Sequence, residues 1–314
     1  MRFSVVIPLY NKEPYVEKTL RSVLDQSFSD YEVIVVNDGS KDGSLEVTKK
    51  VLEGIENATI IDQENNGVST ARNNGIAASK GDYICILDAD DWWEPTFLEE
   101  MDKLIDEYPN AGLHCTNYYY VHNGKSVVKL DIPTGYFNYC KEYARTLCMS
   151  ASSSSSCISK DILNEMDGFK PHLKLGEDFD LWIRIALKYG TAILNKPLVY
   201  LNNDVPVKLR ATHHLHKPEN HMLWNLGYLE EEEKTNPDCK QLIDNLRTYG
   251  LMPYYLSREY HSAAQAELDK VDWSKQNLQI RKEYSRPMLY LKIKRRTLSL
   301  AVAIKRFLIQ IIKK

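Results

Sequence analysis

The 314-residue sequence lacks features that mark several common protein classes. Its six cysteines are scattered without a CxxC pair, which argues against a zinc ribbon or redox site and favours a reducing compartment. The apolar stretch after Arg2 spans only about eight residues before Asn11, too short for a signal peptide. No window reaches about 18 uninterrupted apolar residues. We therefore expect neither secretion nor a membrane-spanning helix.

The sequence also lacks a strong overall charge. Forty Lys and Arg against 43 Asp and Glu give a net charge of −3, so no global field attracts nucleic acid, and we predict no nucleic-acid partner. With 43% hydrophobic and 26% charged residues, the composition is that of a soluble globular protein. The basic charge is concentrated at the end, because residues 281–314 carry 11 Lys and Arg against Glu283 alone.

Two common phosphate-binding motifs are missing as well. The sequence contains no GxxxxGK[ST] loop and no GxGxxG after a predicted strand, which excludes the usual ATPase and dinucleotide-binding devices. A diphosphate bound by this chain would therefore need a metal ion to neutralise its charge.

The first 117 residues alternate strand and helix patterns. Apolar, β-branched runs at 3–9, 32–36, 58–61 and 83–87 predict buried strands. Helical periodicity after Pro14, and over 44–52, 69–79 and 95–108, predicts helices between them. This alternation indicates βαβ units and an α/β fold with a mostly parallel, Rossmann-like sheet flanked by helices.

The remaining chain is less regular. Residues 161–190 predict a helical segment interrupted at Gly168, and the serine run 152–156 is interpreted as a small-residue strand close to a ligand rather than a linker. Beyond residue 218 the chain is helical and polar, and the acidic run 230–233 predicts a solvated helix face. We expect a main domain over 1–218 with halves 1–117 and 118–218, a helical extension over 219–280 and a basic amphipathic segment over 281–314.

Polar side chains follow three of the predicted strands. Tyr10 closes the first, Asp38 the second, and Asp88 and Asp90 follow the fourth. Ligands of such sheets bind at the carboxyl ends of the strands. Asp88 and Asp90, at i and i+2, point to the same side and suit Mg2+ or Mn2+ bridged to a diphosphate. The alternative is that Asp90 and Asp91 cap the next helix.

Three side chains near this edge suit a nucleotide. Tyr10 can stack on a base, and the Asp38 carboxylate can accept the imide N–H of uracil. Arg72 can hold a diphosphate with its bidentate fork. Each residue alone also has an ordinary structural interpretation, and only their convergence on one edge favours binding.

Four sequence runs together resemble family 2 glycosyltransferases, inverting enzymes of the GT-A fold that use nucleotide-diphospho-sugars. They are SVVIPLYNKEPYVEKTLRSVLDQS, VIVVNDGSKDGS, GVSTARNNGIAASKGDYICILDADD and GEDFDLWIR, in this order over about the first 190 residues. The resemblance implies a nucleotide-binding half over 1–117 and an acceptor and catalytic-base half over 118–218.

The resemblance also implies roles for individual residues. It assigns the following positions to the nucleotide and the metal–diphosphate site: Pro8, Tyr10 and Asp38 to the base, Arg72 to the nucleotide, and Asp88 and Asp90 to Mn2+ or Mg2+. It makes Asp178 the catalytic base, with Glu177 orienting it or contacting the acceptor. An inverting displacement requires such a carboxylate to take the acceptor proton. Asp180 is expected to be structural, and an acidic helix N-terminus is the alternative for all three.

Histidines downstream are further candidates. In the resembled family a later His or Arg often completes the metal or diphosphate site, which makes Arg210, His213 and His214 possible partners. His213 is the one we assign to the metal. The alternative is that these residues and His216 are surface histidines and a surface arginine.

The resemblance and the basic tail together predict transfer of a sugar, from a UDP-sugar, to a cell-surface polysaccharide or lipid-linked acceptor. If residues 292–314 form one helix, it has a basic face that can bind an anionic membrane, which places the chain at the cytoplasmic face of the cell membrane. The alternative is that this helix packs on protein. Other interpretations are a non-catalytic, membrane-peripheral module that binds a sugar nucleotide or glycan and, more remotely, a nucleotidyltransferase.

Overall fold

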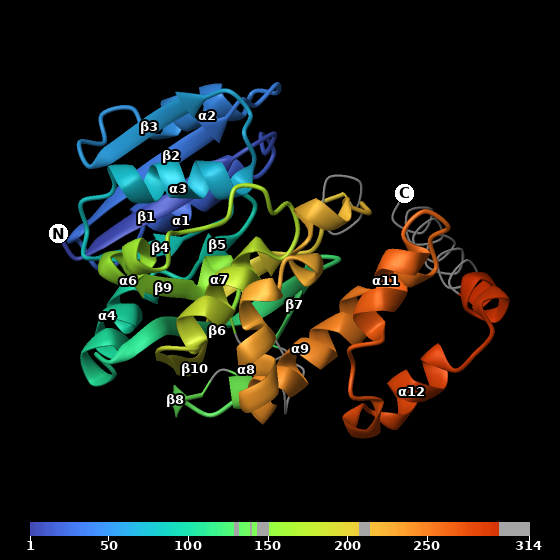
Figure 1. The fold of residues 1–314 in the computed structure, drawn as a ribbon. Coiled ribbons are helices and arrows are strands. Elements are labelled where there is room, and N and C mark those ends of the chain that lie inside the picture. Colours follow the sequence, from blue (N-terminus) through green and yellow to red (C-terminus); the bar gives the residue numbers. More distant parts are fainter. Residues whose placement is uncertain (129–131, 139, 143–150, 207–213, 295–314) are drawn as a thin grey trace. The chain divides into compact units, whose positions relative to one another are not determined.

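The computed structural model describes residues 1–128, 132–138, 140–142, 151–206 and 214–294 (Figure 1). The chain divides into two compact units, Met1–Asn225 and Leu226–Lys314. The division follows Asn225, whereas the sequence patterns placed it after residue 218. The part of the predicted basic helix that follows residue 294 lies outside the described residues.

The first unit is built on a mixed β-sheet. Among the described residues the sheet has 10 strands in the order β3-β2-β1-β4-β9-β6-β10-β5, with β7 beside β6 and β8 beside β10. The strands are β1 Phe3–Leu9, β2 Tyr31–Asp38, β3 Ala58–Gln63, β4 Tyr83–Ile86, β5 Trp92–Trp93, β6 Ala111–His122, β7 Lys125–Val128, β8 Gly135–Phe137, β9 Ser156–Ser159 and β10 Gly190–Asn202.

The strands predicted from the sequence form one parallel block. β3, β2, β1 and β4 are neighbours and run parallel, with Val5 of β1 in register with Val33 on one side and Cys85 on the other. β9 is antiparallel to both β4 and β6, while β10 is parallel to β6. The predicted parallel α/β architecture is therefore confirmed for the first half of the sheet, and the second half is mixed.

Helices cover both faces of the parallel block. They are α1 Val16–Leu24, α2 Ser44–Val51, α3 Val68–Ala78 and α4 Phe97–Glu107, followed by α6 Lys160–Glu165 and α7 Glu177–Ala186. Val5 and Ile7 of β1 share a cluster with α1 and α4, whereas Ile34 and Val36 of β2 pack with Ala71 of α3 on the other face. Successive strand side chains point to opposite faces, so a continuous apolar strand needs both layers.

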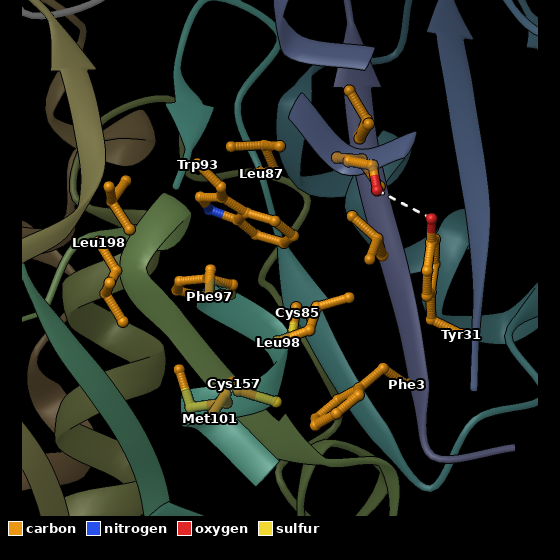
Figure 2. Close-up of a cluster of buried hydrophobic side chains, with 14 of the residues drawn as sticks. Phe3, Tyr31, Cys85, Leu87, Trp93, Phe97, Leu98, Met101, Cys157 and Leu198 are labelled. Carbon is orange, nitrogen blue, oxygen red and sulfur yellow. Dashed lines mark hydrogen bonds between the residues drawn. The ribbon is translucent and has the colours of Figure 1, made fainter. Parts of the chain in front are cut away.

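The cluster beneath α1 and α4 is the larger core, and Figure 2 shows part of it. Phe3, Phe97 and Leu98 are fully buried there, and the Trp93 and Phe97 rings stack at 4.0 Å between centroids. The Tyr31 hydroxyl donates to the carbonyl of Val23 at 2.8 Å, the dashed line of Figure 2. Each buried large apolar side chain contributes roughly 1.5–3 kcal/mol.

On the opposite face α3 approaches the sheet closely. A Cβ at Gly75 would lie 2.3 Å from Val6 and 3.3 Å from Val36, so only glycine lets the helix reach this distance from β1 and β2. The approach matters for the site, because α3 also carries Arg72.

The segment between β8 and α7 corrects one expectation. The serine run does not form a strand throughout, because Ser153–Ser155 is a 3-10 turn and β9 begins only at Ser156. The helical segment predicted after residue 161 is present as α6 and α7. Its predicted interruption at Gly168 is confirmed: Gly168 has φ +59°, a conformation that favours glycine.

The second unit is helical. Its described helices are α8 Glu230–Thr235, α9 Pro237–Gly250, α10 Met252–Tyr255, α11 His261–Leu268 and α12 Leu278–Tyr284. The acidic run 230–233 was expected to be solvated throughout, and for Glu233 this is wrong. Its carboxylate accepts two bonds, at 2.6 and 2.9 Å, from the buried guanidinium of Arg247. Among the described helices, none has both the length and the apolar character to cross a membrane.

Candidate active site

A cleft of about 640 Å³ opens at the carboxyl ends of β1, β2 and β4. Seven of the residues selected from the sequence line it, namely Pro8, Tyr10, Asp38, Arg72, Asp88, Asp90 and Glu177. They come from the ends of three parallel strands, from α3 and from the first turn of α7. The topology therefore brings together residues that lie up to 169 positions apart, from Pro8 to Glu177.

Asp38 shapes one wall of the cleft. Its carboxylate accepts bonds from the backbone N–H groups of Asn66 and Gly67, at 2.8 and 2.9 Å, and from the Gln63 side chain at 2.8 Å. These bonds fix the loop that leads into α3. Tyr10 on the neighbouring strand end is 46% exposed, so its ring remains accessible. Contact of both residues with a base stays a prediction.

Arg72 connects the two acidic groups of the cleft. Its guanidinium is buried and donates to Asp88 Oδ1 and to Glu177 Oε1, each at 2.9 Å. Burial alone would lower its pKa, but the carboxylates of Asp88, Glu177 and Asp178 outweigh this and raise the pKa. The Nε–H of Arg72 has no hydrogen-bond partner among the described residues. A buried, unsatisfied donor that borders a cleft is suited to an anionic ligand.

The acidic cluster after β4 divides into carboxylates that line the cleft and one that is internal. Asp88 and Asp90 line the cleft, and Asp90 forms a 2.5 Å ion pair with Lys12. Burial and the neighbouring Asp88 raise the pKa of Asp90 against the effect of Lys12. Asp91 is buried and accepts from Ser154 Oγ at 2.6 Å and from the Asn202 backbone at 2.8 Å. It fixes the loop rather than facing the cleft.

The capping alternative for these aspartates is wrong. α4 begins at Phe97, its N-cap is Thr96, and β5 separates it from the acidic cluster. Because Asp90 and Asp91 lie before β5, neither reaches the first turn of α4. Their bonds go to Lys12, Ser154 and Asn202 instead.

The cleft offers the oxygen donors that a hard divalent cation takes. In the part of the chain that the structure describes, no three His, Cys, Asp or Glu residues form a metal cluster. Asp88 and Asp90 supply two carboxylates, and Mg2+ or Mn2+ commonly binds one or two carboxylates together with phosphate oxygens and water. Arg72 and Lys12 each occupy one carboxylate oxygen of this pair. The residues therefore fit a metal whose remaining ligands come from a diphosphate.

The first turn of α7 carries the candidate base. Gly176 precedes it in a left-handed conformation, φ +81°, and a Cβ there would lie 2.9 Å from Met222. Asp178 accepts the backbone N–H of Phe179 at 2.8 Å and forms no ion pair with a described residue. Burial, followed by the negative charge of Glu177, raises its pKa to about 7. A carboxylate with such a pKa is suited to accept a proton near neutral pH.

Asp178 and Asp180 have different surroundings. Asp178 does not line the cleft itself but follows Glu177, which does. Asp180 is fully buried and pairs with Lys170 at 2.7 Å and Arg184 at 2.8 Å. This agrees with the structural role predicted for Asp180.

The downstream histidines are only partly described. His213 and Arg210 lie outside the described residues, so their predicted roles stay predictions. His214 is exposed, His216 is partly buried, and neither lines the cleft. His221, which the sequence patterns did not select, is buried and pairs with Leu175 just before α7. Burial lowers its pKa to about 4, so it is neutral at pH 7.

Several cleft residues were not predicted. Lys12, Asn65, Asn66 and Lys174 line it beside the selected residues. Lys12 had a detectable signal, since it follows Tyr10 by two positions in the loop after β1. Lys174 had none, because it lies in an irregular segment whose position depends on the loop at 217–222, through the bond from its N–H to Asn220 at 2.8 Å.

The fold and this cleft define an α/β protein whose charged residues gather at the carboxyl edge of a parallel sheet, the position typical of nucleotide-binding sites. The model of glycosyl transferase family 2 matches residues 4–166, more than half of the chain. The chain belongs to this family.

Individual relatives cover different parts of the chain. GlyG, a glycosyltransferase of Streptococcus pneumoniae serotype 4, is 25% identical over an alignment of 282 residues that covers 84% of this chain and 91% of GlyG. GlyA of the same organism is 41% identical over 118 residues, 38% of this chain but 17% of GlyA. EpsH of Bacillus subtilis is 38% identical over 98 residues, 31% of this chain and 28% of EpsH. The chain thus matches less than a third of GlyA and of EpsH.

Solved structures share the fold. TarS of S. aureus, residues 1–349 in complex with UDP-GlcNAc, superposes with a TM-score of 0.71 at 21% identity, over 86% of this chain and 80% of that one. PcManGT, a mannosyltransferase of Pyrobaculum calidifontis in complex with GDP-Man and Mn2+, gives a TM-score of 0.52 at 18% identity, over 88% of each chain. The likeness to TarS confirms the predicted GT-A type fold.

Proposed function

We propose that this chain is an inverting, metal-dependent glycosyltransferase. It moves one sugar from a nucleotide-diphospho-sugar, a UDP-sugar, to a hydroxyl of a cell-surface polysaccharide or lipid-linked acceptor. The observation that carries this proposal is Arg72, which joins the candidate metal carboxylate Asp88 to Glu177 beside the candidate base within one cleft.

Asp178 acts as the general base. Its raised pKa, about 7, allows it to take the proton of the acceptor hydroxyl while that oxygen attacks the anomeric carbon from the face opposite the leaving group. Glu177 is held by Arg72, and the charge of Arg72 offsets only part of the rise in the Asp178 pKa that burial and Glu177 cause. The fixed start of α7 orients both carboxylates.

Two cations that line the cleft bind the donor diphosphate. Arg72 and Lys12 both line the cleft, where their positive charges can attract phosphate oxygens, Lys12 by exchanging Asp90 for phosphate. Asp88 and Asp90 would hold Mn2+ or Mg2+. When bound, that ion stabilises the negative charge that develops on the departing nucleoside diphosphate. The Mn2+ in the PcManGT complex supports this assignment by similarity.

The donor base and the acceptor are inferred from similarity and from charge. UDP-GlcNAc is bound by TarS, whose fold this chain shares, and Tyr10 and Asp38 line the part of the cleft that would hold uracil. A relative, TuaG of Bacillus subtilis, is named as a putative teichuronic acid biosynthesis glycosyltransferase, which supports a surface polysaccharide as the acceptor. The net positive charge of residues 281–314 supports work at the cytoplasmic face of the membrane.

The test is turnover of UDP-sugars by the purified chain. We expect slow release of UDP from at least one of UDP-GlcNAc, UDP-glucose and UDP-galactose in the presence of Mn2+, and none after chelation by EDTA. Asp178→Asn should abolish sugar transfer while binding of UDP, measured by calorimetry, stays within about threefold of wild type.

A matched control separates this effect from a general loss of charge. Asp161→Asn removes an exposed carboxylate of α6 in the same unit, away from the cleft, and should leave turnover unchanged. Full activity of Asp178→Asn would remove Asp178 as the base. UDP binding without any turnover in wild type would favour a non-catalytic binding module.

A further inference from the structure

The helical unit contains a second cavity that the proposed chemistry does not use. It has a volume of about 320 Å³ and lies among α10, α11, α12 and the turn at residues 273–275. Three aromatic side chains line it, Tyr255, Trp273 and Tyr284. This volume is at the lower end of the range for small-molecule sites, and a single sugar ring fits such a space.

The aromatic rings do not fill the cavity by stacking on one another. Tyr284 meets Tyr255 at 5.5 Å and Trp273 at 5.1 Å between ring centroids, each at an interplanar angle of 60°. In both pairs the edge of one ring meets the face of the other, so the three rings line the cavity at an angle to one another and not as a stack. The Tyr284 hydroxyl donates to the carbonyl of buried Thr248 at 2.8 Å, which fixes the central ring of the three.

Polar groups complete the lining. Arg281 is exposed, and its guanidinium forms no ion pair or side-chain hydrogen bond with another described residue. The Gln265 amide nitrogen donates to Asp269 at 2.7 Å, and its carbonyl oxygen is left to accept. Ser285 also borders the cavity, and Leu268 is the single aliphatic side chain among its described lining residues.

We propose that this cavity binds a pyranose ring of the glycan acceptor. The inference rests on the proposed function, which supplies a glycan as the natural ligand of the chain. A pyranose has a flat face of C–H bonds and an edge of hydroxyl groups. The aromatic rings offer apolar, electron-rich faces to the C–H bonds, and Arg281 and Gln265 offer a donor and an acceptor to the hydroxyls.

The kinds of side chain that line the cavity favour a sugar over other ligands. A lipid chain or an apolar helix would need aliphatic walls, and Leu268 is nearly alone in that role. A phosphate would need more than the one cation that lines the cavity. Aromatic rings with a few hydrogen-bonding side chains suit a ligand that is amphipathic across a single ring.

The experiment uses the full chain and defined probes. Saturation-transfer NMR is recorded with the methyl glycosides of glucose, galactose, N-acetylglucosamine and glucuronic acid, and Kd is measured by titration for each binder. We expect at least one glycoside to bind in the presence of saturating UDP. Trp273→Ala should weaken that binding about 3- to 10-fold, the loss of one aromatic contact.

Two further variants keep the result interpretable. Arg281→Ala changes an exposed side chain, so it should preserve folding and weaken the same glycoside, whereas Arg258→Ala, an exposed arginine outside the cavity, should not. No binding by any of the four glycosides, or weakening by Arg258→Ala as strong as by Arg281→Ala, would overturn the inference. UDP release from UDP-GlcNAc by wild type is measured separately. If release is absent with UDP-glucose and UDP-galactose as well, while Trp273→Ala still weakens glycoside binding, the proposed activity fails and the sugar site remains.

Discussion

Two buried arginines, Arg72 in the cleft and Arg247 in the helical unit, look alike by burial and charge. Their relative exposures are 3% and 2%, both pair with several carboxylates, and in both these partners raise the pKa against the effect of burial. They differ in whether the Nε–H of the guanidinium has a hydrogen-bond partner. The Nε of Arg72 has no partner among the described residues, whereas the Nε of Arg247 donates to Glu267 at 3.2 Å.

The partners differ in the same way. Arg247 is on α9 and is held by Glu233 of α8 and Glu267 of α11, so it ties three helices together. Arg72 is held by Asp88 and Glu177, both of which line the cleft. A buried ion pair is therefore weak evidence for function by itself. The unused donor and the open side of the partner carboxylates are what indicate a binding site.

The largest effect expected from this comparison is on stability. Arg247→Ala removes the buried cation that Glu233 and Glu267 share and leaves them only the more exposed Lys240 and Lys270, which should cost up to about 3–5 kcal/mol of unfolding free energy. Urea denaturation followed by circular dichroism measures it. Arg258→Ala in the same unit is exposed and should change the free energy by less than about 0.5 kcal/mol. A loss below 1 kcal/mol for Arg247→Ala would show that its network is not a structural support.

Arg72→Ala should instead act mainly on catalysis. Removing one preorganised donor from a site where charge develops typically costs about 10²–10³ in rate, and kcat/KM for UDP-sugar turnover measures this. Arg72→Lys keeps the charge but loses the planar fork that spans Asp88 and Glu177, so it should recover only a small part of the activity. If Arg72→Lys were fully active, positive charge alone would explain the role of Arg72, and its geometry would not matter.

A smaller effect concerns pH. Asp178 must be ionised to accept a proton, and its pKa is raised to about 7. Turnover should therefore fall below pH 7 by about tenfold for each pH unit and level off above pH 8. The pH profile of kcat/KM checks this, with UDP binding at pH 6 as the control for an intact donor site. A profile that stays level down to pH 5 would contradict the assignment of the base.

The first half of the fold was predictable because most of its strands, β1, β2 and β4, are buried on both faces. Continuous apolar runs such as β1 are typical of strands in a parallel sheet that is covered on both faces. The carboxyl ends of these parallel strands place Tyr10, Asp38 and Asp88 at one edge of the sheet. β10 escaped prediction because its polar centre and Pro197 interrupt the apolar pattern, where the register with β6 shifts at bulges.

The interaction partners of the site residues were harder to predict from the sequence than the site residues themselves. The residues Arg72 and Asp88 could be selected from sequence motifs, but the ion pair between Arg72 and Glu177 crosses 105 residues and depends on where α7 begins. Lys12 opposite Asp90 and Ser154 beneath Asp91 are likewise products of the assembled sheet. In the helical unit no sequence motif distinguished Glu233 from the three glutamates that precede it.

The smallest expected effect returns to stability and concerns Asp178. Because its pKa in the folded chain lies above the ordinary aspartate value of 3.8, the folded state holds its proton more tightly than the unfolded state. Stability from this group is present below about pH 4 and is lost as pH rises toward 7. Asp178→Asn is neutral at every pH and avoids that loss, so its melting temperature should exceed that of wild type at pH 8. At pH 4 the two should melt together. A variant that is inactive yet more stable at pH 8 would show that the base, unlike Arg247, is maintained at a cost to folding.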